Sequence, residues 1–583
     1  MVSMSSSGVT APSWPAWYDA EGLEALLNTW LAERPGLIEV TSIGQSWQGR
    51  EIWLATCTDA ATGPAEEKPA LFVEANIHAA ELTASSAALH LLHRLLEGHG
   101  WDDRVTRLLR TRTVYVVPRV SPDGAEEVLR TGRYVRSSLR PHPEPERKPG
   151  LHQCDIDGDG RSLFMRLPDR HGPWKASRED VRLLVPREPD EDDPDGDYYR
   201  LLLEGEVVGP DTGAVVMAPP LEGLDLAANF HSDWPEASER PRPSGPYAGS
   251  EPETAALLRA VTDRPNVAAY LTLHTFGAVH LRPPLNDEEL PGEDLRRYRE
   301  LGERATQLTG YPEMSYDELK HTPYRVRGGQ LSWLYHECGI PTWITELWNP
   351  LRAAGVSGFH PSRWLVDHPV DDDLALLRWN DRELGGKGFV DWYPFDHPQL
   401  GKVELGGWDL VHYWYNPPAD AVEAEVAGNT EWAIFLTLSS PLLEVVSAGS
   451  EWLTEDVHRV RLVVGNNGWL PTHATDKARE RRQTPPVTAT IGLPEGAELL
   501  ASPDAGAETI DLGHLAGRSG AHTSTTWWGH EAGTPDRAVA EWLVRATSGT
   551  VLALTARQPR AGVARTEVTL TATRDTVNPS ERS

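Results

Sequence analysis

Four residues of the chain have the types and positions expected of a hydrolytic metal centre. His78 and Glu81 follow one apolar run, His274 ends a second and Glu346 ends a third. Two imidazoles and one carboxylate leave one position of a zinc ion open, as catalytic zinc sites require. A further carboxylate that does not bind the metal is then free to take a proton from an activated water.

The segments that carry these residues have the patterns of strands and helices. The patterns predict an apolar strand followed by an amphipathic helix over 71–99, and further strands over 113–120, 269–274 and 341–346. In α/β domains, ligand sites lie beyond the carboxyl ends of the strands. The sequence therefore predicts that the four side chains meet at one edge of a sheet.

Each candidate also has a plainer role when it is taken alone. In a chain with 21 His, about one His-x-x-Glu motif is expected by chance. A His at a strand end is more often a hydrogen-bonded structural residue than a ligand. Glu81 suits the first turn of a helix by its charge, and Glu346 alone is typical of a cap or a salt bridge. The four together favour the metal centre.

Six further motifs follow one another along the chain in an order known from one protein family. They are Gly44–Ile52, Ser121–Gly124, Arg133–Arg136, Asp225–Phe230, Ser250–Glu253 and Tyr324–Gly329. With the His-x-x-Glu motif, they resemble the zinc metallocarboxypeptidase family over about residues 15–350. The resemblance is to a divergent, bacterial-type member with an insertion and an added C-terminal β domain. It implies an α/β fold with a mixed eight-stranded sheet flanked by helices.

The resemblance also implies a role for each matching residue. The zinc ligands, for one Zn²⁺ per chain, would be His78, Glu81 and His274. Glu346 would be the general base, Arg136 would stabilise the developing oxyanion, and Tyr324 would close over bound substrate. Taken alone, Arg136 is typical of a surface ion pair and Tyr324 of a half-buried loop aromatic.

The chain departs from the family at the carboxylate clamp. The Asn-Arg pair that holds the terminal carboxylate of the substrate is replaced by Ala227 and Ala228. Alanine cannot make the bidentate contact for which arginine is preferred. Three explanations stay open: another cation takes over, the substrate has a blocked or branched end, or the protein binds metal without turnover. The candidate cations are Arg133, Arg325 and Arg327, together with Arg166.

These features predict a zinc-dependent peptidase that hydrolyses a peptide or amide bond. The alternatives are an amidase or peptidase for blocked or branched ends, and a non-catalytic metal-binding relative. Two His and one carboxylate also form the iron site of non-haem oxygenases. Those sites need no extra Glu beside the metal and usually lie in all-β barrels.

An insertion over about residues 139–222 carries a second candidate metal site. Asp155, Asp157 and Asp159 occupy the first three ligand positions of a calcium loop, over 155–166, with Gly160 at the sixth position. The twelfth position is Arg166 instead of a bidentate Glu, so an EF-hand is not expected. The alternatives are a Ca²⁺ site completed by another carboxylate and a plain Asp-Gly turn.

Composition agrees with a large acidic enzyme. The 583 residues exceed a single core, and the net charge of −31 argues against nucleic acid and anionic membranes as partners. The start of the chain lacks the pattern of a secretory signal and no run approaches transmembrane length, which predicts a cytoplasmic protein. Three scattered cysteines, Cys57, Cys154 and Cys338, fit a reducing compartment. The oligomeric state is not indicated.

The C-terminal part predicts a separate all-β, sandwich-like domain. We expect a disordered N-terminus over 1–14, a carboxypeptidase-like domain over 15–395 and the β domain over 396–583, with short strands and turns from about 420. Asn466-Asn-Gly468 is a strong hairpin signal. Trp469, Trp527 and Trp528 either bind a substrate chain or pack on the catalytic domain.

Overall fold

The computed structural model describes most of the chain. The described residues are 8–13, 17–143, 145–191, 193, 196–210, 213–234, 236, 243–283, 290–319, 328–503, 506–520 and 533–571. Tyr324, Arg325, Arg327, Trp527 and Trp528 therefore lie outside the described residues.

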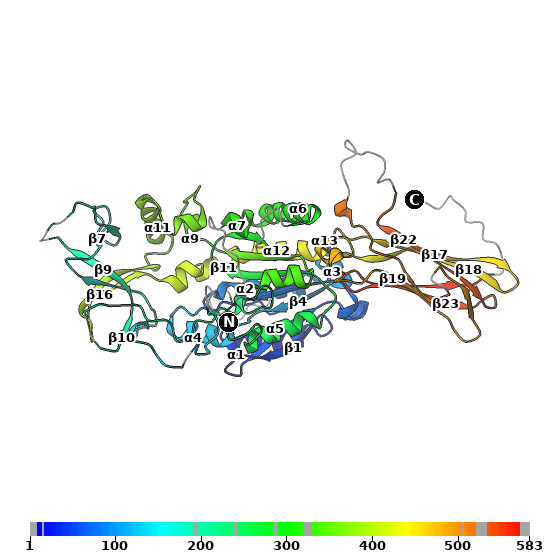
Figure 1. Cartoon of the computed structure of the whole chain (residues 1–583), viewed down its shortest axis with the longest axis horizontal. Helices are drawn as coiled ribbons and strands as arrows, with labels where there is room; N and C mark the ends of the chain where they lie inside the picture. The colour runs from blue at the N-terminus through cyan, green and yellow to red at the C-terminus, as the bar shows by residue number, and fades with distance from the viewer. Residues whose placement is uncertain are drawn as a thin grey trace.

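The centre of the molecule is a mixed eight-stranded sheet (Figure 1). Its strands, in spatial order, are β1 (Ile38–Gln45), β2 (Glu51–Cys57), β4 (Thr113–Val117), β3 (Ala70–Ala75), β11 (Val267–Thr275), β14 (Thr342–Leu347), β12 (Val279–Arg282) and β13 (Glu313–Ser315). The four central strands from β4 to β14 run parallel, the pairs β1–β2, β2–β4 and β14–β12 are antiparallel, and the edge pair β12–β13 is parallel. The predicted mixed eight-stranded sheet is confirmed.

Helices cover both faces of this sheet. One face packs against α1 (Ala20–Glu33), α2 (Leu82–Gly98), α3 (Asp103–Thr111), α6 (Gly292–Thr309) and α12 (Val422–Ser439). The other face packs against η3 (Leu226–Ala228), α5 (Pro252–Thr262) and η6 (Trp333–Glu337). Because both faces are covered, β3 and β11 are buried at every position, as expected for central parallel strands. The flanking helices predicted from the sequence are present.

The insertion folds together with a later part of the chain. A six-stranded sheet has the order β15 (Phe389–His397), β16 (Gly401–Trp408), β6 (Phe164–Pro168), β9 (Tyr198–Leu203), β7 (Trp174–Ala176) and β8 (Leu184–Pro186). A small second sheet pairs β5 (Gly150–Gln153) with β10 (Gly205–Val208). The predicted boundary at 396 is wrong, because β16 pairs with β6 and so ties the hairpin to the insertion.

The chain then returns to the central domain. The helix α12 lies where short strands and turns were predicted from about 420, and it packs against the same core as α2 and α6. The remaining helices are α4 (Pro122–Thr131), α7 (Tyr316–Leu319), α8 (Gln330–Ser332), α9 (Pro350–Ala353), α10 (Pro361–Trp364), α11 (Val370–Glu383) and α13 (Asp476–Glu480), with the short turns η1 (Ala60–Thr62), η2 (Ala65–Glu67), η7 (Leu410–Tyr415), η8 (Ala419–Ala421) and η9 (Arg518–Gly520).

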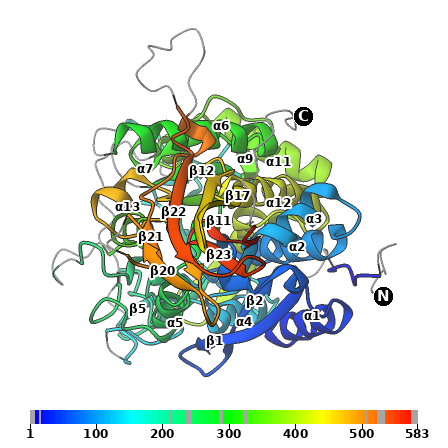
Figure 2. The ribbon, with the colours of Figure 1, turned by 90° about the vertical axis from the view of Figure 1, so that its right-hand side faces the viewer.

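A β-sandwich projects from one end of the central domain (Figures 1 and 2). Its two antiparallel sheets are β17 (Leu443–Thr454), β18 (Val457–Asn466), β22 (Arg537–Arg545) and β20 (Glu498–Ala501), and β21 (Thr509–Asp511), β19 (Thr488–Gly492), β23 (Val551–Gln558) and β24 (Gly562–Thr569). Its own apolar core lies between the sheets. The all-β C-terminal domain is confirmed.

Two local predictions fail. The segment 466–468 forms no hairpin, because β18 pairs with β17 and β22, whereas the side chain of Asn466 accepts from the backbone N–H of Leu442 and donates to the carbonyl of Leu470. Residues 8–13 were predicted to be disordered, but Val9 is fully buried in the core and the backbone N–H of Thr10 donates to Glu33 at 2.8 Å. In the described part of the chain, no helix combines the length and apolar character needed to cross a membrane.

Candidate active site

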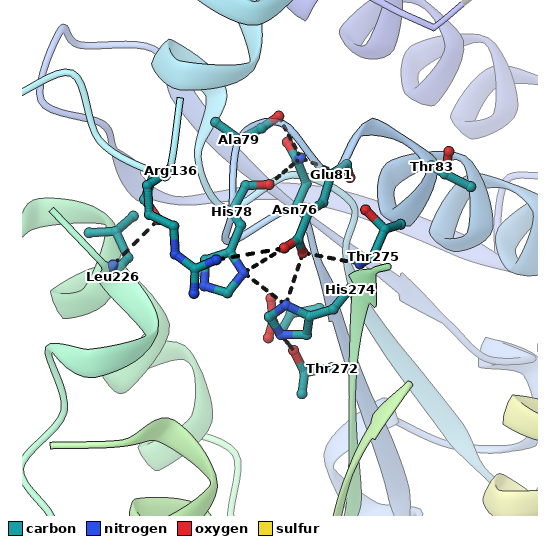
Figure 3. Close-up of polar contacts among 12 residues, drawn as sticks. Asn76, His78, Ala79, Glu81, Thr83, Arg136, Leu226, Thr272, His274 and Thr275 are labelled. Carbon is teal, nitrogen blue, oxygen red and sulfur yellow. Dashed lines mark hydrogen bonds and ion pairs between the residues drawn. The ribbon is translucent and has the colours of Figure 1, made fainter. Parts of the chain in front are cut away.

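The three predicted metal ligands converge at the carboxyl ends of β3 and β11 (Figure 3). His78 Nδ1 lies 2.8 Å from Oε1 of Glu81, and His274 Nδ1 lies 2.9 Å from Oε2 of the same carboxylate. The two Nδ1 atoms are only 3.0 Å apart. All three side chains are buried, so water does not separate them from one another.

A buried asparagine shapes the loop that carries two of these residues. Asn76 follows β3 with a left-handed φ of 57°, a conformation that asparagine tolerates better than most residues. Its side-chain amide donates to the backbone carbonyls of His78, Ala79 and Glu81 at 2.8 to 3.1 Å. The loop is thereby held in the shape that turns both side chains toward β11, and Glu81 begins α2.

The outer nitrogens of both imidazoles have hydrogen-bond partners. His78 Nε2 lies 3.3 Å from Oδ1 of Asp225, and His274 Nε2 lies 2.9 Å from Oγ1 of Thr272. A hydrogen on each Nε2 leaves the lone pair of each Nδ1 directed inward, which is the usual arrangement of metal-binding histidines. Two such lone pairs and a carboxylate within 3.0 Å of one another need a positive charge between them, which a bound cation supplies.

The donor set fits zinc. Imidazole nitrogen and carboxylate oxygen are zinc ligands at bond lengths of about 2.0–2.2 Å, and three protein ligands are typical of catalytic sites. Burial raises the pKa of Glu81, but His78 and His274 together lower it to about 2, so the carboxyl is ionised. With a divalent cation bound in place of the imidazole proton, the site would present one anionic and two neutral ligands.

Glu346 lies beside this cluster without joining it. In the parallel pair β11–β14, Glu346 is the register partner of His274. Residues in register on neighbouring strands point to the same face, so its carboxyl faces the cluster. Burial raises the pKa of Glu346 to about 7, against the opposing effect of His274. A bound cation would lower that pKa. Glu346 is thus placed as a proton acceptor at neutral pH.

Arg136 completes the group. Its Nε and Nη2 donate to Oδ2 of Asp225 at 3.2 and 3.0 Å, and its Nη1 lies 3.9 Å from Oε1 of Glu81. Asp225 thus holds both the Arg136 guanidinium and the His78 imidazole.

Comparison with known proteins agrees with this geometry. A profile described as zinc carboxypeptidase matches residues 23–364, more than half of the chain. The chain belongs to the zinc carboxypeptidase family. A second profile, of a domain family of unknown function, matches residues 442–569, which form the sandwich.

Individual members of the zinc carboxypeptidase family are distant from this chain. Carboxypeptidase B of Astacus astacus is 22% identical over 359 residues, which cover 59% of this chain and 89% of that protein. The zinc carboxypeptidase of Saccharothrix mutabilis subsp. capreolus is 29% identical over 110 residues, 18% of this chain, and the match spans only 25% of that protein. The solved carboxypeptidase A of Helicoverpa armigera shares 19% identity, covers 57% of this chain and 65% of that chain, and has a TM-score of 0.37.

The two alanines that the sequence predicts in place of the carboxylate clamp lie close to Asp225 in the chain. Ala227 and Ala228 lie in the short turn η3, between Asp225 and Asn229. The side-chain amide of Asn229 already donates hydrogen bonds to the backbone carbonyls of Ser244 and Tyr247. Of the arginines considered as replacements, Arg325 and Arg327 lie outside the described residues, as does Tyr324.

The other two arginines are engaged in ion pairs. Arg133 Nη2 donates to Glu222 at 2.6 Å and lies 3.4 Å from Glu127. Arg166 Nε donates to Glu404 at 2.6 Å, with its guanidinium carbon 4.7 Å above the ring of Tyr199. Arg166 thus holds the inserted sheet to β16, and both side chains have structural partners.

The predicted calcium turn is only partly assembled as expected. Asp155 and Asp157 come together with Glu204, which the sequence did not single out. Asp159 turns away, because its carboxylate accepts from Nη2 of Arg161 at 2.6 Å. Both oxygens of Glu204 already accept backbone N–H groups, from Ile156 and Leu163. Calcium binding at this turn stays a prediction.

Asp225 contacts both His78 and Arg136 but is not among the site residues predicted from the sequence. We expect Asp225→Asn to weaken zinc affinity by about 10–100-fold, the range typical of partners behind a ligating histidine. The measurement is competition with a zinc-binding dye of known affinity. Asp233→Asn, a change of the same type at a nearby residue outside the cluster, serves as control. Equal affinity in Asp225→Asn and the control would show that Asp225 does not act on the metal.

Proposed function

We propose that the protein is a zinc-dependent peptidase that hydrolyses a peptide or amide bond with Glu346 as general base. One observation carries the proposal: His78, Glu81 and His274 form a complete ligand set, and the neighbouring carboxyl of Glu346 lies beside that set without belonging to it. A structural metal site has no need of that free carboxyl. The proposal rests further on membership of the zinc carboxypeptidase family.

Each side chain of the site has a distinct task in this reaction. When bound, Zn²⁺ supplies a Lewis acid that polarises the substrate carbonyl and lowers the pKa of water. Glu346 accepts the proton of the attacking water and later gives it to the leaving amine. Arg136 donates to the carbonyl oxygen as negative charge develops there, and a preorganised donor of this kind contributes about 3 kcal/mol. Asp225 keeps Arg136 in place.

The alanines at the clamp position support a second, narrower proposal about the substrate. A free α-carboxylate buried in the site needs a charged partner, because an unpaired buried charge is costly. Ala227 and Ala228 offer none. An amidated end, or one whose carboxyl is blocked by another group or a branch, carries no such charge. We therefore propose peptides or amides with blocked or branched ends as the preferred substrates.

Restoring an arginine tests this specificity. We expect Ala228→Arg to raise kcat/KM for free C-terminal ends relative to amidated ends by at least about tenfold, since a charge-assisted hydrogen bond contributes about 1.5–3 kcal/mol. The ratio is measured with paired peptides that differ only in C-terminal amidation.

The matched control is Ala228→Met, which adds similar bulk without a charge. If Ala228→Met changes the ratio as much as Ala228→Arg, the effect comes from size. If the parent protein already prefers free ends, the proposal of blocked or branched substrates is wrong, whereas the hydrolytic proposal stands.

A further inference from the structure

A basic cavity lies at the junction between the central domain and the sandwich. It has a volume of about 470 Å³. Five arginines line it, with Glu444 as the one carboxylate among the lining residues: Arg104, Arg107, Arg112, Arg304 and Arg518. The elements that contribute them, α3 and α6 from the central domain and the start of η9 from the sandwich, meet at the end of the central sheet from which the sandwich projects (Figure 1).

The charge of this cavity is opposite to that of the whole protein. The chain has 86 acidic and 55 basic residues, a net charge of −31. In such a chain, arginines have many carboxylates available as partners, yet these five share a single lining carboxylate. Gathering like charges in one concave site costs electrostatic energy and focuses a positive potential there. The arrangement is expected where the site receives an anion.

Arg112 is the fixed element of the cavity. Its side chain is almost fully buried. Its Nε and Nη2 donate to Oγ and O of Ser440 at 2.7 and 3.1 Å, and its Nη1 donates to the hydroxyl of Thr111 at 3.0 Å. Burial lowers the pKa of Arg112 to about 10; Glu444 opposes this, whereas Arg107 and Arg518 lower the pKa further. Arg107 and Arg518 are therefore close enough for their positive charges to act on Arg112.

Arg107 and Arg518 are the groups that remain available. Both are exposed, and within the described part of the chain neither side chain has a hydrogen bond or an ion pair. The other two arginines are engaged: Arg104 pairs with Glu431 at 2.9 Å, and the guanidinium carbon of Arg304 lies 5.6 Å from the ring centroid of Phe435. Arg107 comes from α3 and Arg518 from the sandwich, so an anion between them would bridge the two domains.

The remainder of the lining is apolar. Phe435 and Leu438 come from α12, and Leu442 and Trp469 come from the start of the sandwich. Trp469 also packs against the core of the central domain, so its ring is held in place. A cavity lined by both guanidinium groups and aromatic rings suits a ligand with an anionic head and an apolar or planar body.

We propose that this cavity binds an organic anion of the phosphate class, with its head between Arg107 and Arg518, beside the buried charge of Arg112, and its body against Trp469. The planar fork of arginine matches phosphate oxygens in a bidentate way, and three such groups exceed the needs of a single negative charge. The ligand stabilises the junction between the domains, since it contacts both. The site is distinct from the metal cluster and goes beyond the proposed hydrolysis.

Calorimetric titration of the zinc-loaded full chain tests the proposal with three probes: phenyl phosphate, inorganic phosphate and phenol. We expect phenyl phosphate to bind most tightly, inorganic phosphate more weakly, and phenol not measurably. Arg107→Ala combined with Arg518→Ala is expected to weaken phenyl phosphate binding more than about tenfold. Because the two arginines have no partners in the described structure, the double variant is expected to keep the unfolding temperature of the parent.

Arg461→Ala combined with Arg459→Ala is the matched control, since it removes two exposed positive charges from the sandwich away from the cavity. The control should bind phenyl phosphate as the parent does. The proposal is overturned if no probe binds the parent, or if the cavity variant and the control bind phenyl phosphate equally. Inorganic phosphate binding as tightly as phenyl phosphate would overturn the role of Trp469 and assign the cavity to a simple anion.

Discussion

Replacing Glu346 with glutamine is expected to lower kcat by about 10²–10⁴-fold, the contribution typical of a positioned general base. The amide keeps the size of the carboxyl but cannot accept a proton from water. Because Glu346 does not belong to the ligand set, zinc content should stay at one ion per chain. Activity and metal content are measured on the same preparation.

The control is Glu39→Gln, an exposed carboxylate on β1 of the same sheet, which should leave both quantities unchanged. A Glu346→Gln protein that loses its zinc would place Glu346 among the ligands. A variant that keeps both zinc and full activity would remove Glu346 from the reaction, and a different base would then be required.

Replacing His274 with alanine is expected to abolish stable metal binding. The substitution removes one of three ligands and leaves His78 and Glu81 as an incomplete set. Removing a residue that only hydrogen-bonds to a ligand already lowers metal affinity by about 10–100-fold. Removing a ligand itself should cost more, so we expect zinc affinity to fall by more than about 100-fold. Metal analysis after dialysis against a weak chelator measures the loss, and activity should disappear with the metal.

His280→Ala is the informative control. His280 is also buried in the central sheet, on β12, but its two nitrogens contact the hydroxyls of Thr345 and Thr309. Its replacement should lower the unfolding temperature and leave the zinc content at one. If His280→Ala lost zinc as His274→Ala does, the loss would report general destabilisation and not ligation.

The ligand set was predictable because each member follows a strongly apolar strand. Once β3, β11 and β14 are neighbours in one sheet, His78, His274 and Glu346 must meet at its carboxyl edge. Arg136 was predictable only through the family resemblance, since nothing in its local sequence separates it from a surface arginine. The structure places it against Asp225, which also contacts His78.

The partners behind the ligands could not be predicted in the same way. Asn76 and Thr272 are small polar residues in apolar strands or at their ends. Asn76 contacts a backbone carbonyl and Thr272 contacts an imidazole nitrogen, and both contacts form only on folding. Asp225 carried the one available signal, as the first residue of a family motif. Asp225 hydrogen-bonds to Arg136, 89 residues earlier in the chain, and to His78, 147 residues earlier.

The domain boundaries failed for a related reason. The hairpin β15–β16 has the alternating pattern of a sandwich strand pair, and the sequence does not show that its partner is β6 of the insertion. The helix α12 is apolar around most of its circumference because it is buried against α2 and α6, so it lacks the one-sided periodicity that identifies surface helices. Contacts with segments distant in the sequence therefore determine where both the hairpin and α12 lie.

The most direct test of the central claim is mass spectrometry of a mixed peptide pool incubated with the zinc-loaded protein. The pool contains free, amidated and side-chain-branched ends, and parallel samples contain a chelator or the Glu346→Gln variant. We expect new fragments only from the active protein without chelator, mainly from amidated or branched ends. Fragments that persist in the Glu346→Gln sample, or no fragments in any sample, would contradict hydrolysis by this site.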